Sequence, residues 1–310
     1  MNKFAYFEGE IRPIADARVS VMTHTFNYGT GAFGGLRGYW NAQQEQLYVF
    51  RIHDHYRRLL NSARLLLAQL DYTPEHLAEI TIELLRREGW RQDCYIRPIV
   101  YKADEVIGVR LHNLRDEITI FSVPFGRYIQ AEEGAKVCTS SWRRVDDTAI
   151  PPRGKIIGSY ANSALIKSEA QLNGFDEAIV LDQGGHVAEG SAENLFIVRN
   201  GTLITPPPQA NVLEGITRNA VIHLATEELD VPVVEREIDR SELYFADEAF
   251  FCGTGVQVAA IASVDHRPIG AGRMGPITQQ VRDLYYRVVH GEEPRYAHWL
   301  TPVFEAAPVK

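Results

Sequence analysis

The chain has 310 residues, of which 45% are hydrophobic and 23% charged, and its formal net charge is −8. It is long enough for two modest domains, and the negative charge, without a dense run of Lys or Arg, argues against a nucleic-acid-binding protein. The amino-terminal segment lacks the apolar core of a signal peptide, and no apolar run reaches the roughly 18 residues of a membrane span. Three scattered cysteines, Cys94, Cys138 and Cys252, predict free thiols in a reducing compartment, so we expect a cytoplasmic protein.

The first 125 residues predict alternating strands and helices. Spacing and composition predict strands over 46–54, 94–101 and 117–125 and helices over 55–70 and 74–89. Asp54 is the expected N-cap of the first helix. Thr73 and Pro74 predict the start of the second helix. Gly89, just past its last apolar position, predicts its end.

The remainder of the chain predicts hairpins interleaved with helices. Hairpins are expected over 177–190, 194–207 and 247–265 and helices over 160–174, 215–229 and 275–291. The pair Asn200-Gly201 is a strong signal for a tight hairpin turn. We therefore expect a mixed α/β (α+β) fold with a smaller domain over 1–123, a linker over 124–135, which is rich in Gly and charge, and a larger domain over 136–310.

Glycines 29, 31 and 34 have the G-x-G-x-x-G spacing of a dinucleotide-binding turn. Such a turn needs a buried strand before the glycines and a crossover helix after them. The preceding segment is too polar near its end, and too few residues follow before the next strand. The pattern therefore does not favour a dinucleotide-dependent oxidoreductase.

Lys155 lies in a loop rich in Pro and Gly, directly before a predicted helix. A lysine that forms a Schiff base must be partly desolvated so that its amine can attack a carbonyl. A surface lysine beside a turn would have the same local sequence, so the residue alone leaves both interpretations open.

Three later stretches add candidate binding groups. Glu189 and Glu193 lie among small residues ahead of an apolar strand, where a carboxylate can bind a pyridinium nitrogen or simply face water at a hairpin end. Gly215, Ile216 and Thr217 begin a helix whose free N–H groups can bind phosphate. A separate turn over 253–255, with Thr254 between two glycines, can bring backbone close to an anion.

The order and separation of these stretches resemble the class IV aminotransferases, the fold-type IV family that uses pyridoxal 5′-phosphate. The matching segments are K-x-x-G-x-Y at 155–160, E-G-x-x-E-N-L-F at 189–196, G-I-T-R at 215–218 and G-T at 253–254. The stretches MTHTFNYGTGAF and YIRP match the amino-terminal half, so the resemblance covers most of the chain. Within the family the chain is most similar to the branched-chain amino acid aminotransferases.

The resemblance implies a smaller α/β domain followed by a larger pseudo-barrel domain that binds pyridoxal 5′-phosphate. It also implies ping-pong transfer of the amino group between leucine, isoleucine or valine and 2-oxoglutarate. Lys155 would form the Schiff base and carry the proton, Glu189 would bind the pyridine nitrogen and Tyr160 the ring O3′. The implied cofactor-binding residues are Arg58, Lys155, Tyr160, Glu189, Leu213, Gly215, Ile216, Thr217 and Thr254. Arg58, Ile216, Thr217 and Thr254 would hold the phosphate, where a guanidinium suits a bidentate contact.

The implied substrate pocket combines aromatic side chains with one arginine. Its expected members are Tyr28, Phe33, Tyr95, Arg97, Val109, Phe125, Tyr128, Thr254 and Gly255, with Tyr160 beside them. Tyr95 and Arg97 would recognise carboxylates, with Arg97 taking the distal carboxylate of glutamate or 2-oxoglutarate. Read from periodicity alone, Tyr95 and Arg97 are two residues on one face of a half-buried strand.

The chain departs from the family pattern at two pocket positions. Gly34 stands where most members have an acid, and Phe125 stands where Trp is common, so the resemblance leaves the substrate range open. (R)-amine transaminase, D-amino acid transaminase, a mixed specificity and a lyase acting on an aminated chorismate are alternatives on this fold. A catalytically inactive binding protein is a further alternative.

The remaining expectations concern metals and partners. His53 and His55 flank Asp54, but no third ligand lies nearby, so we expect no metal site. The expected partners are amino acids and 2-oxo acids, with no nucleic acid and no membrane. By analogy with the family we expect a homodimer or a higher homo-oligomer.

Overall fold

The structure is a computed structural model that describes residues 3–126 and 134–305. Its backbone contacts divide the chain into two compact units. The first unit comprises Met1–Gly126, Gly154–Gly158 and Arg287–Lys310, and the second comprises Arg127–Arg153 and Ser159–Tyr286. The predicted domain bounds remain a prediction, and most of the predicted linker lies outside the described residues.

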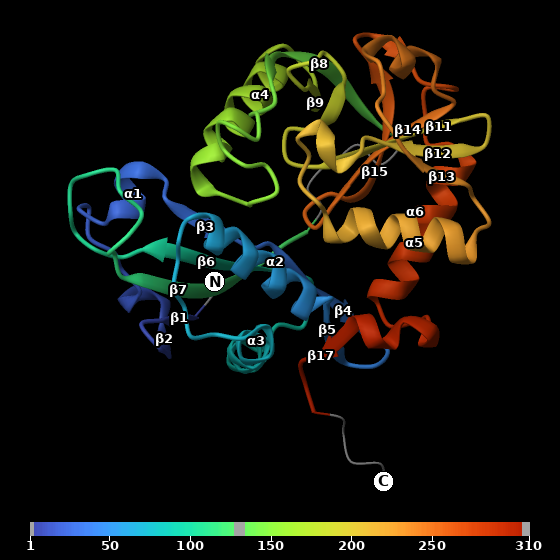
Figure 1. Cartoon of the computed structure of the whole chain (residues 1–310). Helices are drawn as coiled ribbons and strands as arrows, with labels where there is room; N and C mark the ends of the chain where they lie inside the picture. The colour runs from blue at the N-terminus through green and yellow to red at the C-terminus, as the bar shows by residue number, and fades with distance from the viewer. Residues whose placement is uncertain (1–2, 127–133, 306–310) are drawn as a thin grey trace. The chain divides into compact units, whose positions relative to one another are not determined.

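The first unit is built on an 8-stranded sheet with the order β17-β5-β4-β6-β7-β1-β2, in which β3 also pairs with β6. All of these pairings are antiparallel, and Figure 1 shows β6 and β7 side by side. The strands are β1 (Phe4–Phe7), β2 (Glu10–Pro13), β3 (Gly31–Phe33), β4 (Leu36–Asn41), β5 (Gln46–Phe50), β6 (Cys94–Lys102), β7 (Asp116–Pro124) and β17 (Leu300–Pro302). The helices are α1 (His24–Tyr28), α2 (Ile52–Leu65) and α3 (Pro74–Glu88), with short 3-10 turns at Ile14–Asp16 and Pro294–Trp299.

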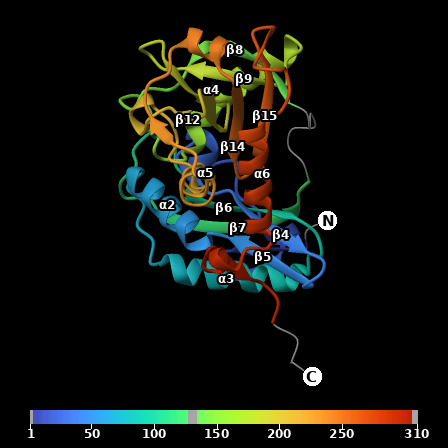
Figure 2. The same ribbon diagram turned by 90° about the vertical axis from the view of Figure 1, so that its right-hand side faces the viewer.

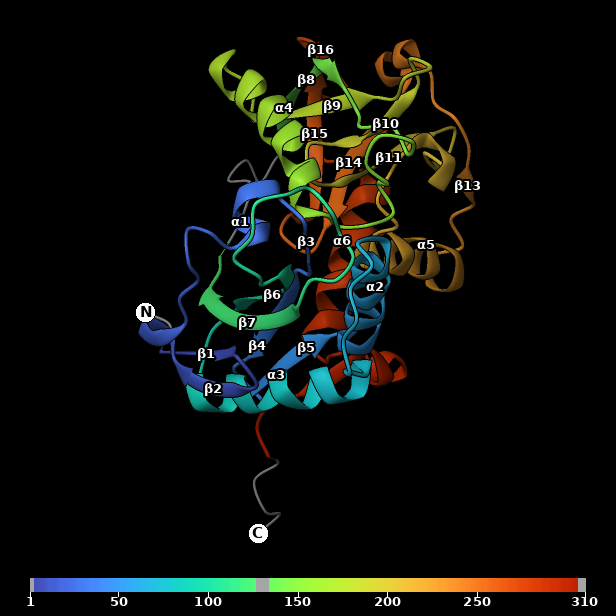
Figure 3. The ribbon, with the colours of Figure 1, turned by 60° about the vertical axis from the view of Figure 1, so that its left-hand side comes forward.

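Helix α3 confirms its predicted capping signals. The Thr73 side chain accepts the backbone N–H of His76, Pro74 is the first helical residue, and Gly89 ends the helix in the left-handed conformation with φ 68°. The apolar face of α3 is buried, with Leu77 among its fully covered residues. The helix packs against α2 and the sheet of this unit (Figure 3).

The predicted boundary between the strand over 46–54 and the helix over 55–70 is wrong. Strand β5 ends at Phe50, and α2 already begins at Ile52, because Arg51 adopts the left-handed conformation (φ 47°) and turns the chain. Asp54 is therefore not the N-cap but lies in the first turn, where its carboxylate pairs with Arg51 at 2.6 Å. At the other end, α2 stops at Leu65, before a left-handed residue at position 67.

The second unit is built on a 9-stranded sheet with the order β10-β9-β8-β15-β14-β11-β12-β13, and β16 pairs with β15. Three pairings, β8 with β9, β8 with β15 and β12 with β13, are parallel, whereas the others are antiparallel. The strands are β8 (Ala135–Arg143), β9 (Glu177–Leu181), β10 (Val187–Gly190), β11 (Asn194–Arg199), β12 (Thr202–Thr205), β13 (Val233–Glu235), β14 (Glu248–Gly253), β15 (Gln257–Val264) and β16 (Arg267–Pro268). The helices are α4 (Tyr160–Leu172), α5 (Ile216–Glu228) and most of α6 (Pro276–Val289), with 3-10 turns at Pro208–Ala210 and Arg240–Phe245. A further 3-10 turn, Ile157–Ser159, begins in a segment of the first unit and ends at the first residue of the second segment of this unit. Figure 2 shows β14 and β15 as neighbouring strands.

The predicted hairpins of this unit are confirmed. Asn200 and Gly201 connect β11 to β12 with positive φ angles of 50° and 75°, which is the geometry that a tight two-residue hairpin requires. Strands β9 and β10, and strands β14 and β15, pair in the same antiparallel way.

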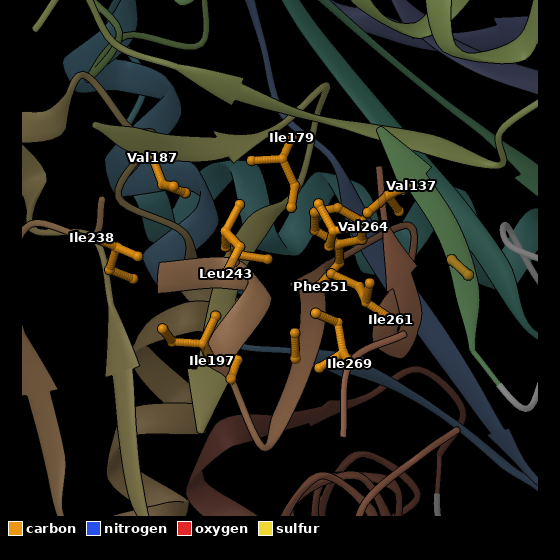
Figure 4. Packing of buried hydrophobic residues seen from close by; sticks show 14 of the residues in the cluster. Val137, Ile179, Val187, Ile197, Ile238, Leu243, Phe251, Ile261, Val264 and Ile269 are labelled. Carbon is orange, nitrogen blue, oxygen red and sulfur yellow. The ribbon is translucent and has the colours of Figure 1, made fainter. Parts of the chain in front are cut away.

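A hydrophobic core joins the strands of the second unit (Figure 4). Val137, Ile179 and Val187 come from β8, β9 and β10, and Ile197 and Phe251 come from β11 and β14. Burial of these branched and aromatic side chains is the main term that stabilises the sheet. The rigid sheet in turn fixes the loops and helix start that carry the candidate site.

No helix within the described ranges 3–126 and 134–305 combines the length and the apolar character that a membrane crossing needs.

Candidate active site

Lys155 is held by its backbone against β3 and α2. Its N–H donates to the Ser62 hydroxyl at 3.1 Å, and its C=O accepts the N–H of Phe33 at 2.9 Å. The partly buried side chain lies with Nζ 5.1 Å from the centroid of the Phe33 ring. The fixed backbone and apolar neighbour give the partial desolvation that an amine nucleophile needs.

The glycines near residue 30 are explained by close backbone approach. The pattern is not a dinucleotide turn, because Gly31 lies in β3, which runs antiparallel to β6. A Cβ at Gly29 would lie 2.9 Å from the Cα of Gly158, and one at Gly31 would lie 2.8 Å from the carbonyl oxygen of Val100. Larger residues would therefore push away the segment that carries Lys155.

Two predicted pocket residues, Phe33 and Tyr95, contact the Arg97 guanidinium in the first unit, and a third, Phe125, contacts Tyr95. The guanidinium carbon lies 4.5 Å from the Phe33 ring centroid and 5.1 Å from that of Tyr95, and Arg97 Nη2 donates to the Tyr95 hydroxyl at 3.1 Å. The ring of Phe125 lies 5.2 Å from that of Tyr95. Within the described residues Arg97 forms no ion pair, and its Nε is buried without a hydrogen-bond partner. This charge is suited to an anionic ligand.

Arg58 and Lys155 are connected through one hydroxyl on α2. Ser62 donates to the carbonyl oxygen of Arg58 at 2.8 Å while it accepts the Lys155 N–H. Burial lowers the pKa of the nearby His55 well below its usual value, and the charges of Arg58, Arg51 and Lys155 lower it further. His55 is therefore neutral and adds no charge beside Arg58 and Lys155.

Two predicted pocket residues lie outside this group. The Tyr28 hydroxyl accepts the N–H of Gly108 at 3.0 Å and so fixes the loop after β6, and its ring lies 4.8 Å from that of His24 at an angle of 52°. Val109, on that loop, is 79% exposed, and its role as an apolar wall of the pocket stays a prediction. Tyr128 lies outside the described residues.

Gly34 does not by itself open space in the predicted pocket. A Cβ at this position would lie 2.7 Å from Cγ of Pro98, so that ring already fills the direction a side chain would take. Phe125 is fixed through its carbonyl oxygen, which accepts Arg37 Nη2 at 3.3 Å. The Pro98 ring therefore occupies the space beside Gly34, and the substrate range stays open.

Glu189 is the best-satisfied buried carboxylate of the second unit. It is 3% exposed, and its oxygens pair with Arg144 Nη2 at 2.8 Å and accept Asn194 Nδ2 and the Leu213 N–H, each at 3.1 Å. A cation and two N–H donors favour the ionised carboxylate. Sequence reasoning missed Arg144 and Asn194. Asn194 has a signal, because it follows Glu193 in the quoted motif, whereas Arg144 has none.

Helix α5 begins beside this carboxylate. Its N-cap residue, Gly215, has no side chain that could accept a first-turn N–H. The N–H groups of the first turn are therefore available to bind an anion. A Cβ at Gly215 would lie 2.1 Å from Oδ1 of Asn194, whose amide donates to both Glu189 and the carbonyl oxygen of Leu213. The structure therefore brings Glu189, Leu213 and Gly215 together, followed by Ile216 and the buried Thr217.

The remaining predicted residues lie at the ends of elements of the second unit. Thr254 and Gly255 form the turn between β14 and β15, and β14 pairs with β11 so that Cys252 faces Asn194. Tyr160 is the first residue of α4 and is partly buried. The binding roles of these residues stay predictions.

Among the residues that the structure describes, no group of three or more His, Cys, Asp or Glu side chains is arranged to hold a metal ion. His53 and His55 belong to the first turn of α2, where His55 is buried and His53 is exposed.

Comparison with known proteins places the chain among aminotransferases. The family model for amino-transferase class IV matches residues 31–264. A protein of Aquifex aeolicus (strain VF5) named probable branched-chain-amino-acid aminotransferase is 51% identical over 302 residues, covering 97% of each chain. The branched-chain aminotransferase of Thermoproteus uzoniensis, solved with norvaline, has a TM-score of 0.94 and 42% identity, over 98% of this chain and 100% of that one.

A second solved structure supports the same relationship. The branched-chain amino acid aminotransferase of Thermobaculum terrenum, described as the PLP form, has a TM-score of 0.94 and 40% identity, over 98% of this chain and 99% of that one. These likenesses confirm the predicted fold class and the resemblance read from the sequence. The chain belongs to the class IV aminotransferase family.

Proposed function

We propose that the chain is a pyridoxal-phosphate-dependent aminotransferase that moves the amino group between branched-chain L-amino acids and 2-oxoglutarate by a ping-pong mechanism. The family and the names of the relatives support the reaction. The observation that carries the substrate assignment is the Arg97 guanidinium, which lies among aromatic rings and has no ion-pair partner among the described residues. An apolar side chain fits the rings, and a second carboxylate fits the guanidinium.

The residues present fit the cofactor. Its ring nitrogen requires a fixed anion, which Glu189 offers, and its phosphate requires N–H donors, which the uncapped start of α5 offers. The sequence adds Arg58, Thr217 and Thr254 as phosphate ligands, Tyr160 for O3′, and Lys155 for the aldehyde. The further contacts that we propose are Leu213, Gly215 and Ile216.

Bound pyridoxal phosphate supplies an aldehyde that an amine can attack and a ring that withdraws electrons from the bond being broken. Lys155 Nζ would provide the amine and would take the proton from the substrate Cα as a general base. The Glu189 carboxylate holds a proton at the ring nitrogen. Phe33, Tyr95 and Phe125 exclude water from the apolar part of the substrate, and Arg97 orients a dicarboxylate.

We further propose a homo-oligomer in a reducing, cytoplasmic setting. Apolar side chains exposed on α1 and on the loop after β6, including Phe26 and Val109, support burial against another copy. The cysteines support a reducing compartment, because Cys94, Cys138 and Cys252 are all free thiols.

Absorption spectra test the proposal directly. The purified protein should absorb at the edge of the visible range and bleach on addition of L-leucine, and 2-oxoglutarate should restore the band. Lys155→Ala should lose the visible band and keep its circular dichroism spectrum, whereas Lys136→Ala, on an exposed position of β8, should keep both.

Two outcomes would contradict the proposal. A visible band that survives Lys155→Ala would remove the role of that lysine. Bleaching by (R)-1-phenylethylamine and not by L-leucine would assign the protein to the amine transaminases of this fold.

A further inference from the structure

Glu193 is a buried carboxyl group that the proposed function does not use. It lies in the turn between β10 and β11, four residues after Glu189, and is 4% exposed. A Cβ at Gly190 would lie 2.7 Å from Glu193 Oε2 and 2.9 Å from the Phe251 ring. The carboxyl group therefore lies directly over Gly190, the residue that follows Glu189.

The two carboxyl groups of this turn have unequal partners. Glu189 has the Arg144 guanidinium at 2.8 Å and two N–H donors. The Glu193 carboxyl group accepts the backbone N–H of Ala192 at 3.0 Å, and within residues 3–126 and 134–305 it forms no ion pair. Because an anion is stabilised by a cation and by N–H donors, the negative charge of the pair belongs on Glu189.

The charges that face Glu193 from the neighbouring elements also favour a neutral Glu193 and a negatively charged Glu189. Glu177 on β9 is itself ionically paired with Lys167 of α4 at 2.6 Å, so that lysine is already engaged. Burial raises the pKa of Glu193 to about 8, and the charges of Glu177 and Glu189 raise it, whereas its N–H donor and Lys167 act in the opposite direction. The facing group on β14 is the Cys252 thiol, whose pKa is also raised by burial.

We propose that Glu193 is a positioning residue for Glu189: it holds a proton in the working enzyme, so the pair carries a single negative charge and Glu189 keeps it. A second negative charge at this buried turn would oppose the ionised form of Glu189, whose side-chain donors are the Arg144 guanidinium and the Asn194 amide. A neutral acid leaves both donors on Glu189. The inference rests on the proposed function, in which Glu189 binds the ring nitrogen of the cofactor.

Infrared spectroscopy of the cofactor-loaded, full-length protein tests where the proton resides. At neutral pH the wild type should show the C=O stretch of a protonated carboxylic acid, and this band should disappear as the pH rises through about 8. Glu193→Gln should lack the band. Glu88→Gln is the matched control, because Glu88 is also 4% exposed but accepts three backbone N–H contacts, and it should leave the band in place.

The coupling to Glu189 has its own readouts. In Glu189→Gln the band of Glu193 should be lost at a lower pH, because the neighbouring negative charge is gone. If that variant does not fold, two variants at position 193 test the coupling instead. The kcat for L-leucine should fall about tenfold further in Glu193→Ala than in Glu193→Gln, because glutamine retains a neutral polar group. The pH profile of kcat/KM should also lose its component near pH 8 in Glu193→Gln.

The possible results separate this inference from the proposed function. A wild type without the band, or a band that persists in Glu193→Gln, overturns the inference. Equal kcat in Glu193→Ala and Glu193→Gln, with the same pH profile as the wild type, overturns the positioning role. If the band titrates as expected but L-leucine does not bleach the cofactor, the proposed function fails and the protonated Glu193 stands.

Discussion

Arg37 and Arg97 lie on the same sheet, but their guanidinium groups have different partners. Arg37 pairs with Asp93 at 3.2 Å and donates to the carbonyl oxygens of Phe125 and Gly126. Arg97 donates to a phenol and lies over two rings, and within the described residues it forms no ion pair. A charge taken from water without an opposite charge lowers stability, so the position of Arg97 is best explained by a ligand that brings a carboxylate.

Arg97→Gln should therefore separate the two substrates. The change removes a charged hydrogen-bond donor, which is worth about 1.5–3 kcal/mol to a carboxylate, so kcat/KM for L-glutamate should fall roughly 10–100-fold. For L-leucine, which has no second carboxylate, we expect a change within about threefold, measured in the same coupled assay. Arg91→Gln serves as control because Arg91 also lies over rings, those of Phe304 and Trp40. Equal losses for both substrates would assign Arg97 to the α-carboxylate instead.

Sequence patterns indicate the residues to which we assign chemistry more readily than the residues that hold them in place. Lys155 and Glu189 have local signals, namely a Gly-rich loop and an acid among small residues. Their supports are far away in sequence: Ser62, which supports Lys155, lies in α2, and Arg144, which supports Glu189, directly follows β8. Only the fold brings such pairs together, so a single sequence does not reveal them.

At the scale of elements, the start of α5 depends on a glycine for a packing reason. Gly215 has φ −71°, which any residue can adopt, so its conformation does not require glycine. The requirement is space, since Oδ1 of Asn194 lies 2.1 Å from where a Cβ would be. Asn194 connects this helix start to Glu189, so a displaced Asn194 would disturb both.

Gly215→Ala should consequently weaken cofactor retention at two places. The methyl group would displace Asn194 from Glu189 and crowd the first N–H groups of α5, so we expect at least a tenfold higher dissociation constant for pyridoxal phosphate, or about 1.4 kcal/mol. Equilibrium dialysis followed by the visible absorbance measures it. Gly126→Ala, at a position with no atom within 4 Å of the added Cβ, should bind as the wild type does. Unchanged retention in Gly215→Ala would show that the phosphate does not use this helix start.

The ends of an element were predictable from the sequence where a capping residue specifies them. They were not predictable where only the backbone conformation sets the boundary. Helix α3 begins and ends at Thr73 and Gly89, whose side-chain chemistry and missing Cβ specify the ends. The start of α2 depends on a left-handed arginine, Arg51, which no propensity indicates. The short helix α1 was not predicted at all, because five residues carry too little periodicity.

At the scale of the whole molecule, an ion-pair cluster makes stability depend on acid pH. Glu242 accepts Arg236 at 2.6 Å and Arg199 at 2.9 Å, and these partners, Arg236 first, lower the pKa of Glu242 to about 2. A depressed carboxyl pKa stabilises the fold above the unfolded-state value near 4.5, and that stability is lost as the pH falls through about 2.

Glu242→Gln should lower the free energy of unfolding by about 1–2 kcal/mol near pH 7, a value reduced because both arginines are partly exposed to solvent. The difference from the wild type should shrink between about pH 4.5 and pH 2, as measured by urea unfolding. The exposed pair Arg87–Glu83 provides a control, and Glu83→Gln should change stability by less than about 0.5 kcal/mol. A constant difference between the two proteins at all pH values would contradict the linkage.

The division of the chain into units was only partly readable from sequence. The change in composition after residue 124 marks the end of the first long segment, and that is a local signal. The clustering of 154–158 and of the carboxyl-terminal residues with the first unit is not local. It depends on contacts such as Gly158 N–H to the carbonyl oxygen of Gly29, which join residues more than a hundred positions apart.

The exposed apolar side chains of the first unit make assembly testable. Phe26 on α1 is 69% exposed, and Ile107 and Val109 are 75% and 79% exposed. Their two segments are tied together, because His24 Nε2 bonds to the carbonyl oxygen of Gly108 at 2.7 Å. Contiguous exposed apolar surface of this kind usually marks an interaction site, so we expect these residues to be covered by a second copy of the chain.

Phe26→Asp and Val109→Asp should each shift the protein toward the 35.0 kDa monomer in sedimentation velocity, because a charge buried at the interface opposes association. Leu172→Asp is the control, since Leu172 is exposed at the end of α4 in the second unit and should leave the assembly intact. Both interface variants should keep the wild-type circular dichroism spectrum, which separates dissociation from unfolding. A wild type that sediments as a monomer at micromolar concentration would contradict the expected homo-oligomer, and an oligomer that survives both substitutions would place its interface elsewhere.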